Sequence, residues 1–416
     1  MKKKVLILGG GFGGIATYRN LHRLIHPTNI HNIRLELISR TNYFTFSPML
    51  HEVATGSVDR EHIVQPLREM LHCCGKDFHQ AHVTNIDVEN KVIQTDTGNH
   101  SYDVLVIALG VEQGFFGTPG AAEHALALKW LPGAVAIRNR VISSFEKASE
   151  IHDQKDRHHI PKFLNFIIVG GGATGTEFAG QLSDLLHNEM KRFYGDVPMG
   201  LANITLIHTG ARVLDQLSPS ASKIAARRLR SLGVKLLLNK RVTHVTEDGV
   251  TLASGTTLLS NSVFWTAGTE STLGSLLNPE YLTPRGLLNV TPTFQLTDHP
   301  EVFGIGDCAS VNDPLFSYPP LAQAATQASR VVAKNIVAQL HRGSFIQKKY
   351  KHKGDIIPLG DGFGIFQGKH ILMSGFTAWI FRRIVFLKTM TGWGNRLQVL
   401  FDWCIALFLP RDTSEF

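Results

Sequence analysis

Two glycine-rich segments carry the most specific chemistry in the sequence. Near the start, Gly9, Gly11 and Gly14 have the spacing G-x-G-x-x-G directly after the apolar run Val5 to Leu8. In this spacing the first glycine allows a tight turn, the second lets backbone approach a pyrophosphate, and the third lets a helix pack on a strand. The helix that follows offers free backbone N–H groups and the positive end of its dipole. We therefore predict a dinucleotide site here.

The same pattern returns in the middle of the chain. Gly170, Gly172 and Gly175 follow the apolar run Phe166 to Val169 with the same spacing. A nicotinamide delivers a hydride, and an isoalloxazine ring accepts it, so two dinucleotide sites indicate electron transfer. We expect FAD at the first site and NADH at the second. The expected loop contacts are Gly9, Gly11, Phe12, Gly13 and Gly14 for FAD, and Gly170, Gly172, Ala173, Thr174 and Gly175 for the nicotinamide cofactor.

The residues at the ends of the following strands should meet the riboses. An acid is usual there, but Ser39, followed by Arg40, ends the first pair, and His208 ends the second. Serine can still bond a hydroxyl without charge assistance. With Arg212 nearby, His208 could face a 2′-phosphate, which leaves NADPH use open.

Other strands end in candidate ligand residues. Asp307 follows Gly306 at the end of one, where an acid accepts from ribityl or ribose hydroxyls; the alternative is that it caps a later helix. Glu177, two residues beyond the last glycine, either caps its helix or lies near the nicotinamide and the flavin. Two further predicted contacts are the strand-end glycines Gly110 and Gly268.

These elements predict an α/β protein with two Rossmann-like domains. We expect a discontinuous FAD domain at residues 1–125 and 285–340, an NAD(P)H domain at 126–284, and a C-terminal membrane-association region at 341–416.

Charge and cysteine usage narrow the function. The net charge is +8, and residues 341–416 hold 11 Lys and Arg against 5 Asp and Glu. No nucleic-acid-binding module accompanies this charge, so we expect no nucleic-acid partner. The four cysteines include no C-x-x-C pair, and Cys73 and Cys74 are interpreted as packing residues. No Cys/His spacing predicts a metal site.

The C-terminal stretch from Phe376 to Leu409 alternates apolar and basic residues. It contains three tryptophans, Trp379, Trp393 and Trp403. Helices of this composition lie in a membrane interface. The alternative is a helical hairpin packed on the protein's own core or on a second copy. No apolar run reaches the roughly 18 residues of a spanning helix, and the run after the basic N-terminus is too short for a signal peptide.

The chain resembles the type II NADH:quinone oxidoreductases over almost its whole length. The similarity is carried by GGGFGG, NYFTFSPMLHEVATG, YDVLVIALG, VGGGATGTEFAG, WTAG, FGIGDCA, PPLAQAATQASRVVAKNI and the WIFRR and NRLQVLFDW region. The Ala-Gln-x-Ala-x-Gln run at Ala322 to Gln327 is its most specific part.

The resemblance implies a peripheral flavoenzyme on the cytoplasmic face of a bacterial inner membrane. It implies hydride transfer from NADH to FAD and two-electron reduction of a membrane quinone, without proton pumping. Gln323 and Gln327 would line the quinone pocket, where amides can bond quinone carbonyls. Ala322 would lie beside the flavin, Glu177 where the substrates meet the ring, and Asp307 at the ribityl-phosphate region. Homodimers through the C-terminal region are a family expectation.

Three alternatives stay open on the sequence. A sulfide:quinone oxidoreductase needs a redox cysteine pair near the flavin, and Cys308 has no obvious partner. A membrane-bound flavin redox sensor would turn over slowly. A soluble ferredoxin or rubredoxin reductase would need no membrane.

Overall fold

The computed structural model describes residues 3–25, 33–71, 77–153 and 160–415, and the chain forms two compact units within them. Unit 1 contains residues 1–45, 65–112 and 270–353, and unit 2 contains residues 46–64, 113–269 and 354–416. The chain therefore passes between the units at five points. The assignment of one cofactor to each predicted domain stays a prediction.

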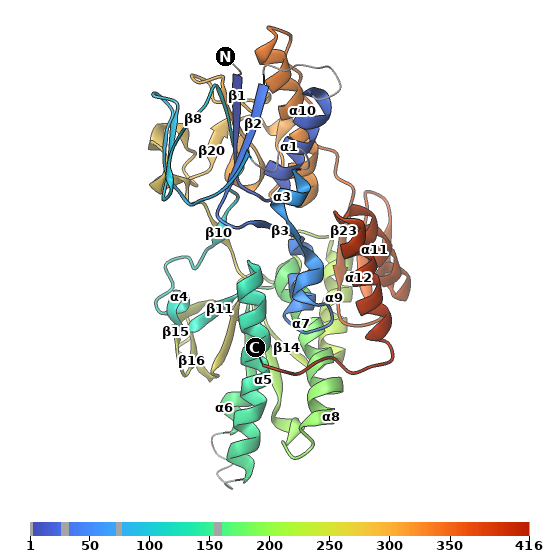
Figure 1. Ribbon diagram of the computed structural model, residues 1–416. Helices are drawn as coiled ribbons and strands as arrows, with labels where there is room; N and C mark the ends of the chain where they lie inside the picture. Colours follow the sequence, from blue (N-terminus) through green and yellow to red (C-terminus); the bar gives the residue numbers. More distant parts are fainter. Residues whose placement is uncertain (1–2, 26–32, 72–76, 154–159, 416) are drawn as a thin grey trace. The chain divides into compact units, whose positions relative to one another are not determined.

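Unit 1 is built on a five-stranded parallel sheet in the order β21-β9-β1-β2-β5. Its strands are β1 (Lys3–Leu8), β2 (Ile33–Ser39), β5 (Phe78–Gln80), β9 (Val104–Ile107) and β21 (Val302–Gly304). The central strands are continuous apolar runs, as expected for a parallel sheet covered on both faces. The helices α1 (Phe12–Ile25) and α10 (Ala322–Leu340) lie side by side beside it (Figure 1).

Smaller elements complete unit 1. A three-stranded antiparallel sheet is formed by β6 (Val83–Asp87), β7 (Val92–Thr95) and β8 (Gly98–Ser101). A two-stranded parallel sheet joins β20 (Leu288–Val290) and β22 (Ala309–Val311). The remaining short elements are β3 (Tyr43–Thr45), β4 (Val64–Pro66), whose first residue belongs to unit 2, α3 (Leu67–Met70), η7 (Pro279–Tyr281), η6 (Leu273–Ser275), η8 (Gly306–Cys308) and η9 (Pro314–Phe316). The chain passes between the units within β10 (Glu112–Gln113) and β19 (Thr269–Glu270).

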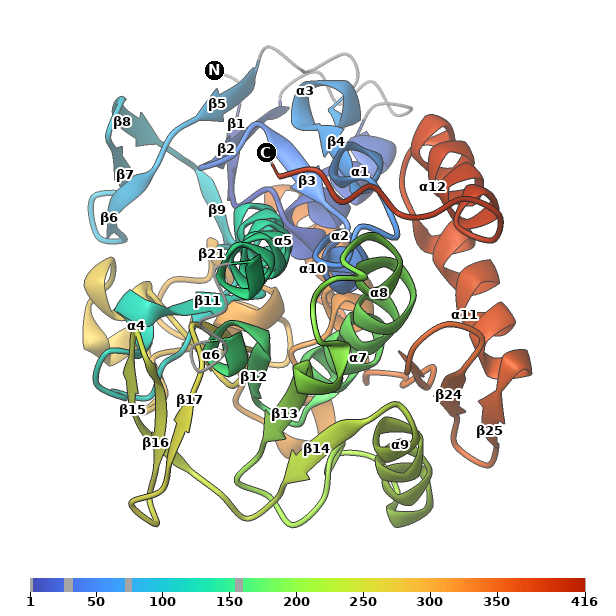
Figure 2. The same ribbon diagram turned by 90° about the horizontal axis from the view of Figure 1, so that it is seen from below.

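Unit 2 repeats this plan with the parallel order β11-β18-β12-β13-β14. The strands are β11 (Ala125–Ala127), β12 (Asn165–Val169), β13 (Asn203–Ile207), β14 (Val234–Leu237) and β18 (Ser262–Trp265). Its helices include α4 (Ala121–His124), α5 (Leu131–Asp153), α6 (Ile160–Leu164), α7 (Ala173–Asp184), η4 (Leu185–Met190), α8 (Lys191–Phe193), η5 (Met199–Leu201) and α9 (Pro219–Ser231). Figure 2 shows α7 and α9 with the strands that they connect, β12 to β14.

A hydrophobic core of unit 2 forms between two sheets. The antiparallel sheet consists of β15 (Val242–Thr246), β16 (Gly249–Leu252) and β17 (Thr257–Leu259), and the buried valines of β15 and β16 pack against β12, β13 and β18. Trp265 on β18 belongs to this cluster. Because both sheets are apolar on the facing sides, their contact holds the carboxyl ends of the parallel strands in place.

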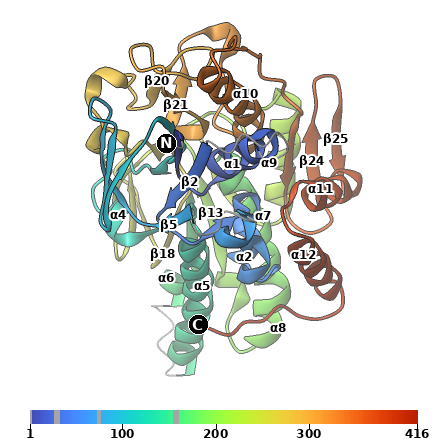
Figure 3. The ribbon, with the colours of Figure 1, turned by 45° about the horizontal axis from the view of Figure 1, so that its top comes forward.

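The segments before and after this core also belong to unit 2. The early segment forms η1 (Ser47–Met49), α2 (Leu50–Val53) and η2 (Arg60–Ile63). The C-terminal segment forms an antiparallel sheet of β23 (Asp355–Pro358), β24 (Gly364–Gln367) and β25 (Leu372–Gly375), then α11 (Phe376–Thr389) and α12 (Trp393–Ile405) (Figure 3). The predicted α/β class with two Rossmann-like units is confirmed.

Candidate functional site

The first glycine turn has the geometry that the spacing predicts. Gly9 has φ +108°, and a Cβ on Gly14 would lie 1.9 Å from the Gly9 carbonyl oxygen, so both positions require glycine. Beside Gly11 the space is open. α1 begins at Phe12, directly after it, and Gly13 packs on Ile305. The turn therefore leaves backbone at a helix N-terminus open to an anion, which fits a pyrophosphate.

The other residues predicted to hold FAD lie at the same edge of the unit 1 sheet. Ser39 ends β2, is buried, and lies against Gly10, while Arg40 forms an ion pair with Glu112 at 2.9 Å. Gly110 follows β9 with φ +70°. Gly306 and Asp307 form the η8 turn after β21. Because β2 and β9 pair with β1, and β21 pairs with β9, all in parallel, their carboxyl ends meet where ligands of such sheets bind.

The two glutamines predicted to bind quinone contact backbone of their own unit. Gln327 donates its Nε2–H to the Lys351 carbonyl at 2.9 Å and accepts from the Lys351 N–H at 3.1 Å. Gln323 accepts from the Lys353 N–H at 3.2 Å. Both lie in the first two turns of α10, which begins at Ala322. Gln327 thus uses both the nitrogen and the oxygen of its amide on Lys351, and a quinone there would have to displace the 351–353 segment.

The second glycine turn repeats the first in unit 2. Gly170 has φ +120°, and a Cβ on Gly175 would lie 1.9 Å from the Gly170 carbonyl oxygen. Beside Gly172 the space is again open. α7 begins at Ala173 and runs through Thr174. The turn therefore offers a second open anion cradle.

The residues predicted to select the nicotinamide cofactor line the next loop. His208 accepts from the Gly171 N–H through Nδ1 at 3.2 Å, and its Nε2 is 3.8 Å from Asp215. Arg212 donates to the Asp215 carbonyl at 2.7 Å, and its buried Nη1 has no hydrogen-bond partner within the described parts of the chain. His208 thus lies against the glycine loop, and Arg212 keeps a donor for an anion. The choice between NADH and NADPH stays a prediction.

Gly268 lies in a crowded turn after β18. It has φ +74°, and the Phe116 ring occupies the space that a Cβ would take. The Gln113 amide donates to the Ala267 and Gly268 carbonyls at 2.8 Å each. The Trp265 indole donates to Ala267 at 2.8 Å. These contacts hold the turn rigidly at the carboxyl edge of the unit 2 sheet.

Glu177, on the first turns of α7, belongs to a buried polar cluster that sequence reasoning missed. Its Oε2 lies 3.7 Å from His51 Nδ1. Glu52, which follows His51 in the sequence, forms an ion pair with Arg382 at 2.7 Å and accepts from the Trp403 indole at 2.7 Å. The residues His51, Glu52, Arg382 and Trp403 are each 2–3% exposed.

The electrostatics of this cluster are strongly perturbed. Burial raises the pKa of Glu177 to about 8, with Arg382 opposing the rise; 14% of its side chain stays exposed. Burial, and then Arg382, lowers the pKa of His51 to about 3. Burial opposes ionisation of Glu52, but Arg382 outweighs it and holds the Glu52 pKa below its usual value. At neutral pH the cluster therefore holds a protonated Glu177, a neutral His51 and an ionised Glu52.

Only a weak sequence signal pointed to this cluster. His51 and Glu52 stand in an apolar segment, and Arg382 stands among apolar residues, where sequence reasoning assigned it to a membrane surface. Charged residues in such segments are rarely buried unless paired. The sequence therefore predicts that Glu52 and Arg382 each have a polar or charged partner, but it does not identify that partner.

The C-terminal helices present two different faces. Trp379, Arg382 and Trp403 are buried within unit 2, and the Arg383 guanidinium stacks 3.6 Å from the Trp379 ring centroid. The rings of Trp379 and Trp403 fill the unit's own core and cannot contact a membrane, while the membrane assignment of the helices stays a prediction. Trp393 is 75% exposed. The other exposed apolar residues of this end of the chain are Phe376, Ile380, Ile384, Leu397, Leu400, Phe401, Leu407, Phe408 and Leu409.

Among the described residues, none of the helices is both long and apolar enough to span a membrane.

A group of possible metal ligands lies in unit 1. Glu36, His79 and His100 offer ligand atoms within 4.8 Å of one another, which the sequence spacing did not predict. Lys4 Nζ is already 2.6 Å from Glu36 Oε2, and Arg34 Nε is 3.1 Å from Oε1. Because two cations already neutralise this carboxylate, a third would meet repulsion.

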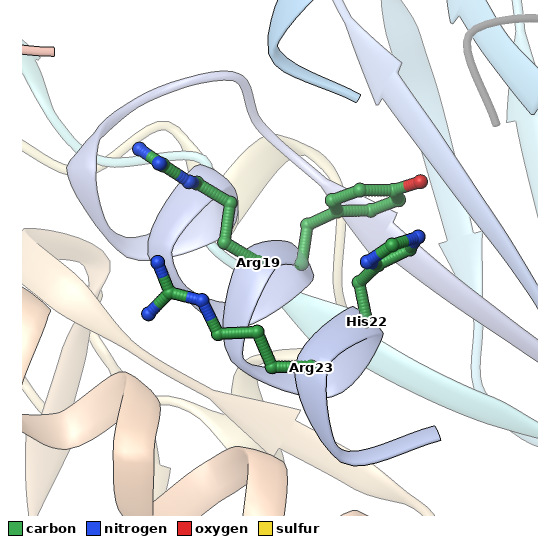
Figure 4. A pocket seen from close by; sticks show the side chains of 4 residues that line it. Arg19, His22 and Arg23 are labelled. Carbon is green, nitrogen blue, oxygen red and sulfur yellow. The ribbon is translucent and has the colours of Figure 1, made fainter. Parts of the chain in front are cut away.

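A hollow of about 150 Å³ opens on the later turns of α1, lined by Tyr18, Arg19, His22 and Arg23. Figure 4 shows both arginines reaching to one side of the helix and His22 to the other. None of the predicted site residues lines it.

The described cysteines offer no redox pair. Cys308 is buried in unit 1, and burial raises the pKa of its thiol to about 11; Cys404 is exposed in unit 2. Cys73 and Cys74 lie outside the described residues.

Two parallel-sheet units with a glycine turn each define a protein of the class that binds two dinucleotides for electron transfer. A family model described as pyridine nucleotide-disulphide oxidoreductase matches residues 3–329, and the chain belongs to this family.

Individual relatives agree with the resemblance drawn from the motifs, which is confirmed. The type II NADH:quinone oxidoreductase Ndh of Mycobacterium tuberculosis is 29% identical over 426 residues, covering 99% of this chain and 89% of the relative. A solved structure of NDH2 from Plasmodium falciparum with NADH has a TM-score of 0.89 at 19% identity over the full length of both chains. The sulfide:quinone oxidoreductase of Aquifex aeolicus has a TM-score of 0.73 at 20% identity, over 98% of this chain and 95% of that one. At such identities the two structures show the fold alone.

Proposed function

We propose that the protein is an NADH:quinone oxidoreductase that passes a hydride from NADH to FAD and then two electrons to a quinone. The observation that carries the proposal is the pair of glycine turns, each open beside its middle glycine at the carboxyl edge of a parallel sheet. The full-length relative with this reaction in its name supports the choice of substrates.

The residues of unit 1 suit FAD. The turn from Gly9 to Gly14 would hold the pyrophosphate by backbone N–H groups, and Ser39 and Asp307 would accept from hydroxyls. When bound, FAD supplies the capacity to accept a hydride and release electrons to a second acceptor. The protein binds and orients the reactants, and no side chain needs to act as a nucleophile.

Glu177 suits the proton balance of this reaction. NADH, one proton and quinone give NAD⁺ and quinol, so each turnover takes up one proton. A carboxyl whose pKa is raised to about 8 keeps its proton at neutral pH and can supply it. We propose this role for Glu177.

We propose Gln323 and Gln327 as the quinone contacts on α10, since amides can bond quinone carbonyls. Both side chains contact backbone of the 351–353 segment, which a bound quinone would have to displace.

We also propose that the exposed apolar face of α11 and α12 lies on a membrane surface, on the cytoplasmic side. Phe376, Ile380 and Ile384 recur every four residues on α11, and Trp393 and Leu397 do so on α12. Apolar stripes with neighbouring basic residues suit an interfacial helix. The homodimer implied by the family resemblance stays a prediction.

The test is anaerobic stopped-flow absorbance of the purified, flavin-loaded protein. NADH should bleach the flavin band rapidly, and a following quinone pulse should restore it. Bleaching by NADPH alone would keep the reaction class and assign the donor to the His208 and Arg212 pocket. If neither nucleotide bleached the band, the proposal would fail, and bleaching by sulfide would favour the sulfide:quinone alternative. Slow oxidation despite saturating quinone would favour the sensor.

A further inference from the structure

A continuous chain of buried polar contacts in unit 2 joins the C-terminal helices to Glu177. Trp403 on α12 contacts Glu52, Glu52 contacts Arg382 on α11, and Arg382 Nη2 lies 3.3 Å from His51 Nε2. His51 Nδ1 then faces the Glu177 carboxyl at 3.7 Å. The mechanism proposed above uses only the last of these side chains.

The direction of the hydrogen bonds determines the His51 tautomer. A guanidinium has donors and no acceptor, so Arg382 donates and His51 Nε2 accepts. A neutral imidazole that accepts at Nε2 carries its hydrogen at Nδ1. The group that His51 presents to Glu177 is therefore an N–H donor. The two atoms are 3.7 Å apart, so a small approach of the side chains forms the hydrogen bond.

Arg382 is held where this selection requires it. Glu52 binds its Nη2 at 2.7 Å, and the guanidinium lies 4.2 Å from the centroid of the Phe386 ring. Trp403 in turn fixes the other oxygen of Glu52. Since Arg382 is 2% exposed, solvent screens its charge little, and the charge acts strongly on these neighbours.

We propose that His51 is a positioning residue that presents Nδ1–H to the Glu177 carboxyl, and that Arg382 of the C-terminal helix α11 selects this tautomer. The importance of the arrangement for turnover rests on the proposed function. The C-terminal helices would then control the hydrogen bonding of the carboxyl that supplies the proton.

The groups around Glu177 predict the sign of the effect. Arg382 from α11 and Glu52 from α2 are the charges that act on it, with His51 between them. Farther along α7, Asp184 interacts with Asp361, Arg228 and Arg411 instead. A donor stabilises the ionised carboxylate, so losing the His51 N–H should raise the Glu177 pKa further.

The experiment is an infrared pH titration of the protonated Glu177 carboxyl in the flavin-loaded protein, without quinone. The band is identified by its loss in the Glu177→Gln variant. His51→Phe should strengthen proton binding about tenfold, one pKa unit. His51→Gln, whose amide can both accept and donate, should restore the wild-type titration. An unchanged titration in His51→Phe would overturn the proposal, and so would equal shifts in both variants, which would indicate packing alone.

Two further readouts make the result specific. In protein labelled with ¹⁵N-histidine, the signals lost in His51→Gln should show hydrogen on Nδ1; hydrogen on Nε2 would overturn the tautomer assignment.

His62→Gln is the matched control. His62 also contacts α12, through Asp402 at 2.6 Å, but it is not part of the series of buried contacts that joins Trp403 to Glu177. In this variant the titration of the Glu177 carboxyl should match that of the wild type, and a shifted titration would contradict a specific path through His51. Failure of NADH and quinone turnover with these shifts intact would refute the proposed function only.

Discussion

At the scale of residues, the surroundings of Glu177 change its acid–base chemistry strongly. Its position on the first turns of a helix would by itself favour the ionised carboxylate, because of the helix dipole. Burial outweighs that preference and raises its pKa to about 8. The helix-capping interpretation therefore does not explain the raised pKa of Glu177, whereas its burial beside His51 does.

This pKa makes stability depend on pH. Between the usual value of 4.5 and about 8, the unfolded chain has lost the proton that the folded protein keeps, so wild-type stability falls as pH rises through that window. Glutamine does not titrate. Relative to wild type, the Glu177→Gln variant should gain about 1–3 kcal/mol in free energy of unfolding from about pH 5 to about pH 8. Urea denaturation measures it, and a difference that is constant across pH would contradict the raised pKa.

Sequence patterns predicted some residues well and others not at all. Gly14 and Gly175 could be placed because their constraint is local: each must clear a carbonyl five residues earlier. Glu52 could not, because its partners Arg382 and Trp403 come more than 300 residues later, and no spacing rule covers such a distance. Asp307 and Gln323 were placed at their elements, but what they bind is not a property of the pattern.

At the scale of elements, α12 shows how one helix serves two surroundings. The sequence predicts an amphipathic helix here, and α12 is one. The prediction assigned the whole apolar side of this helix to a membrane. Trp403 and Val399 turn into the unit, while Trp393, Leu397 and Phe401 stay exposed. Sequence periodicity gives the face of a helix; it does not say whether protein or lipid covers that face.

The buried side of α12 depends on one indole hydrogen bond. Trp403→Phe keeps most of the ring but removes the donor to Glu52, leaving a buried carboxylate oxygen unsatisfied. We expect a loss of about 1–3 kcal/mol in free energy of unfolding. Trp393→Phe, at a position 75% exposed, is the matched control and should change it by less than about 0.5 kcal/mol. Equal losses in urea denaturation would show that the indole bond contributes nothing specific.

At the scale of the whole molecule, charge and exposed apolar surface gather toward the same end of the chain. Most of the net charge of +8 lies in residues 341–416, which also contain the exposed residues of α11 and α12. Basic residues near an anionic surface each contribute about 1 kcal/mol at physiological salt and are screened within a Debye length. Apolar insertion is insensitive to salt by comparison.

Vesicle flotation separates these two contributions. Binding to anionic vesicles should weaken at least tenfold when salt rises from about 0.05 M to about 0.5 M, while weaker binding to neutral vesicles should hardly change. The double variant Leu397→Ser with Phe401→Ser should weaken binding to both, and NADH should still bleach its flavin. Binding to neither vesicle, with self-association in solution lost in the same variant, would assign this face to a second copy instead.

The partners of Glu52 also have a consequence for how the protein is made. The chain leaves the ribosome from its N-terminus, and Trp403 follows Glu52 after 351 residues. At usual rates of synthesis that interval lasts roughly 20–70 s. Throughout it the segment 46–64 lacks its contacts with α12. Nascent chains should therefore expose an unfinished second unit until translation is almost complete, and stalling before Arg382 should leave them dependent on chaperones.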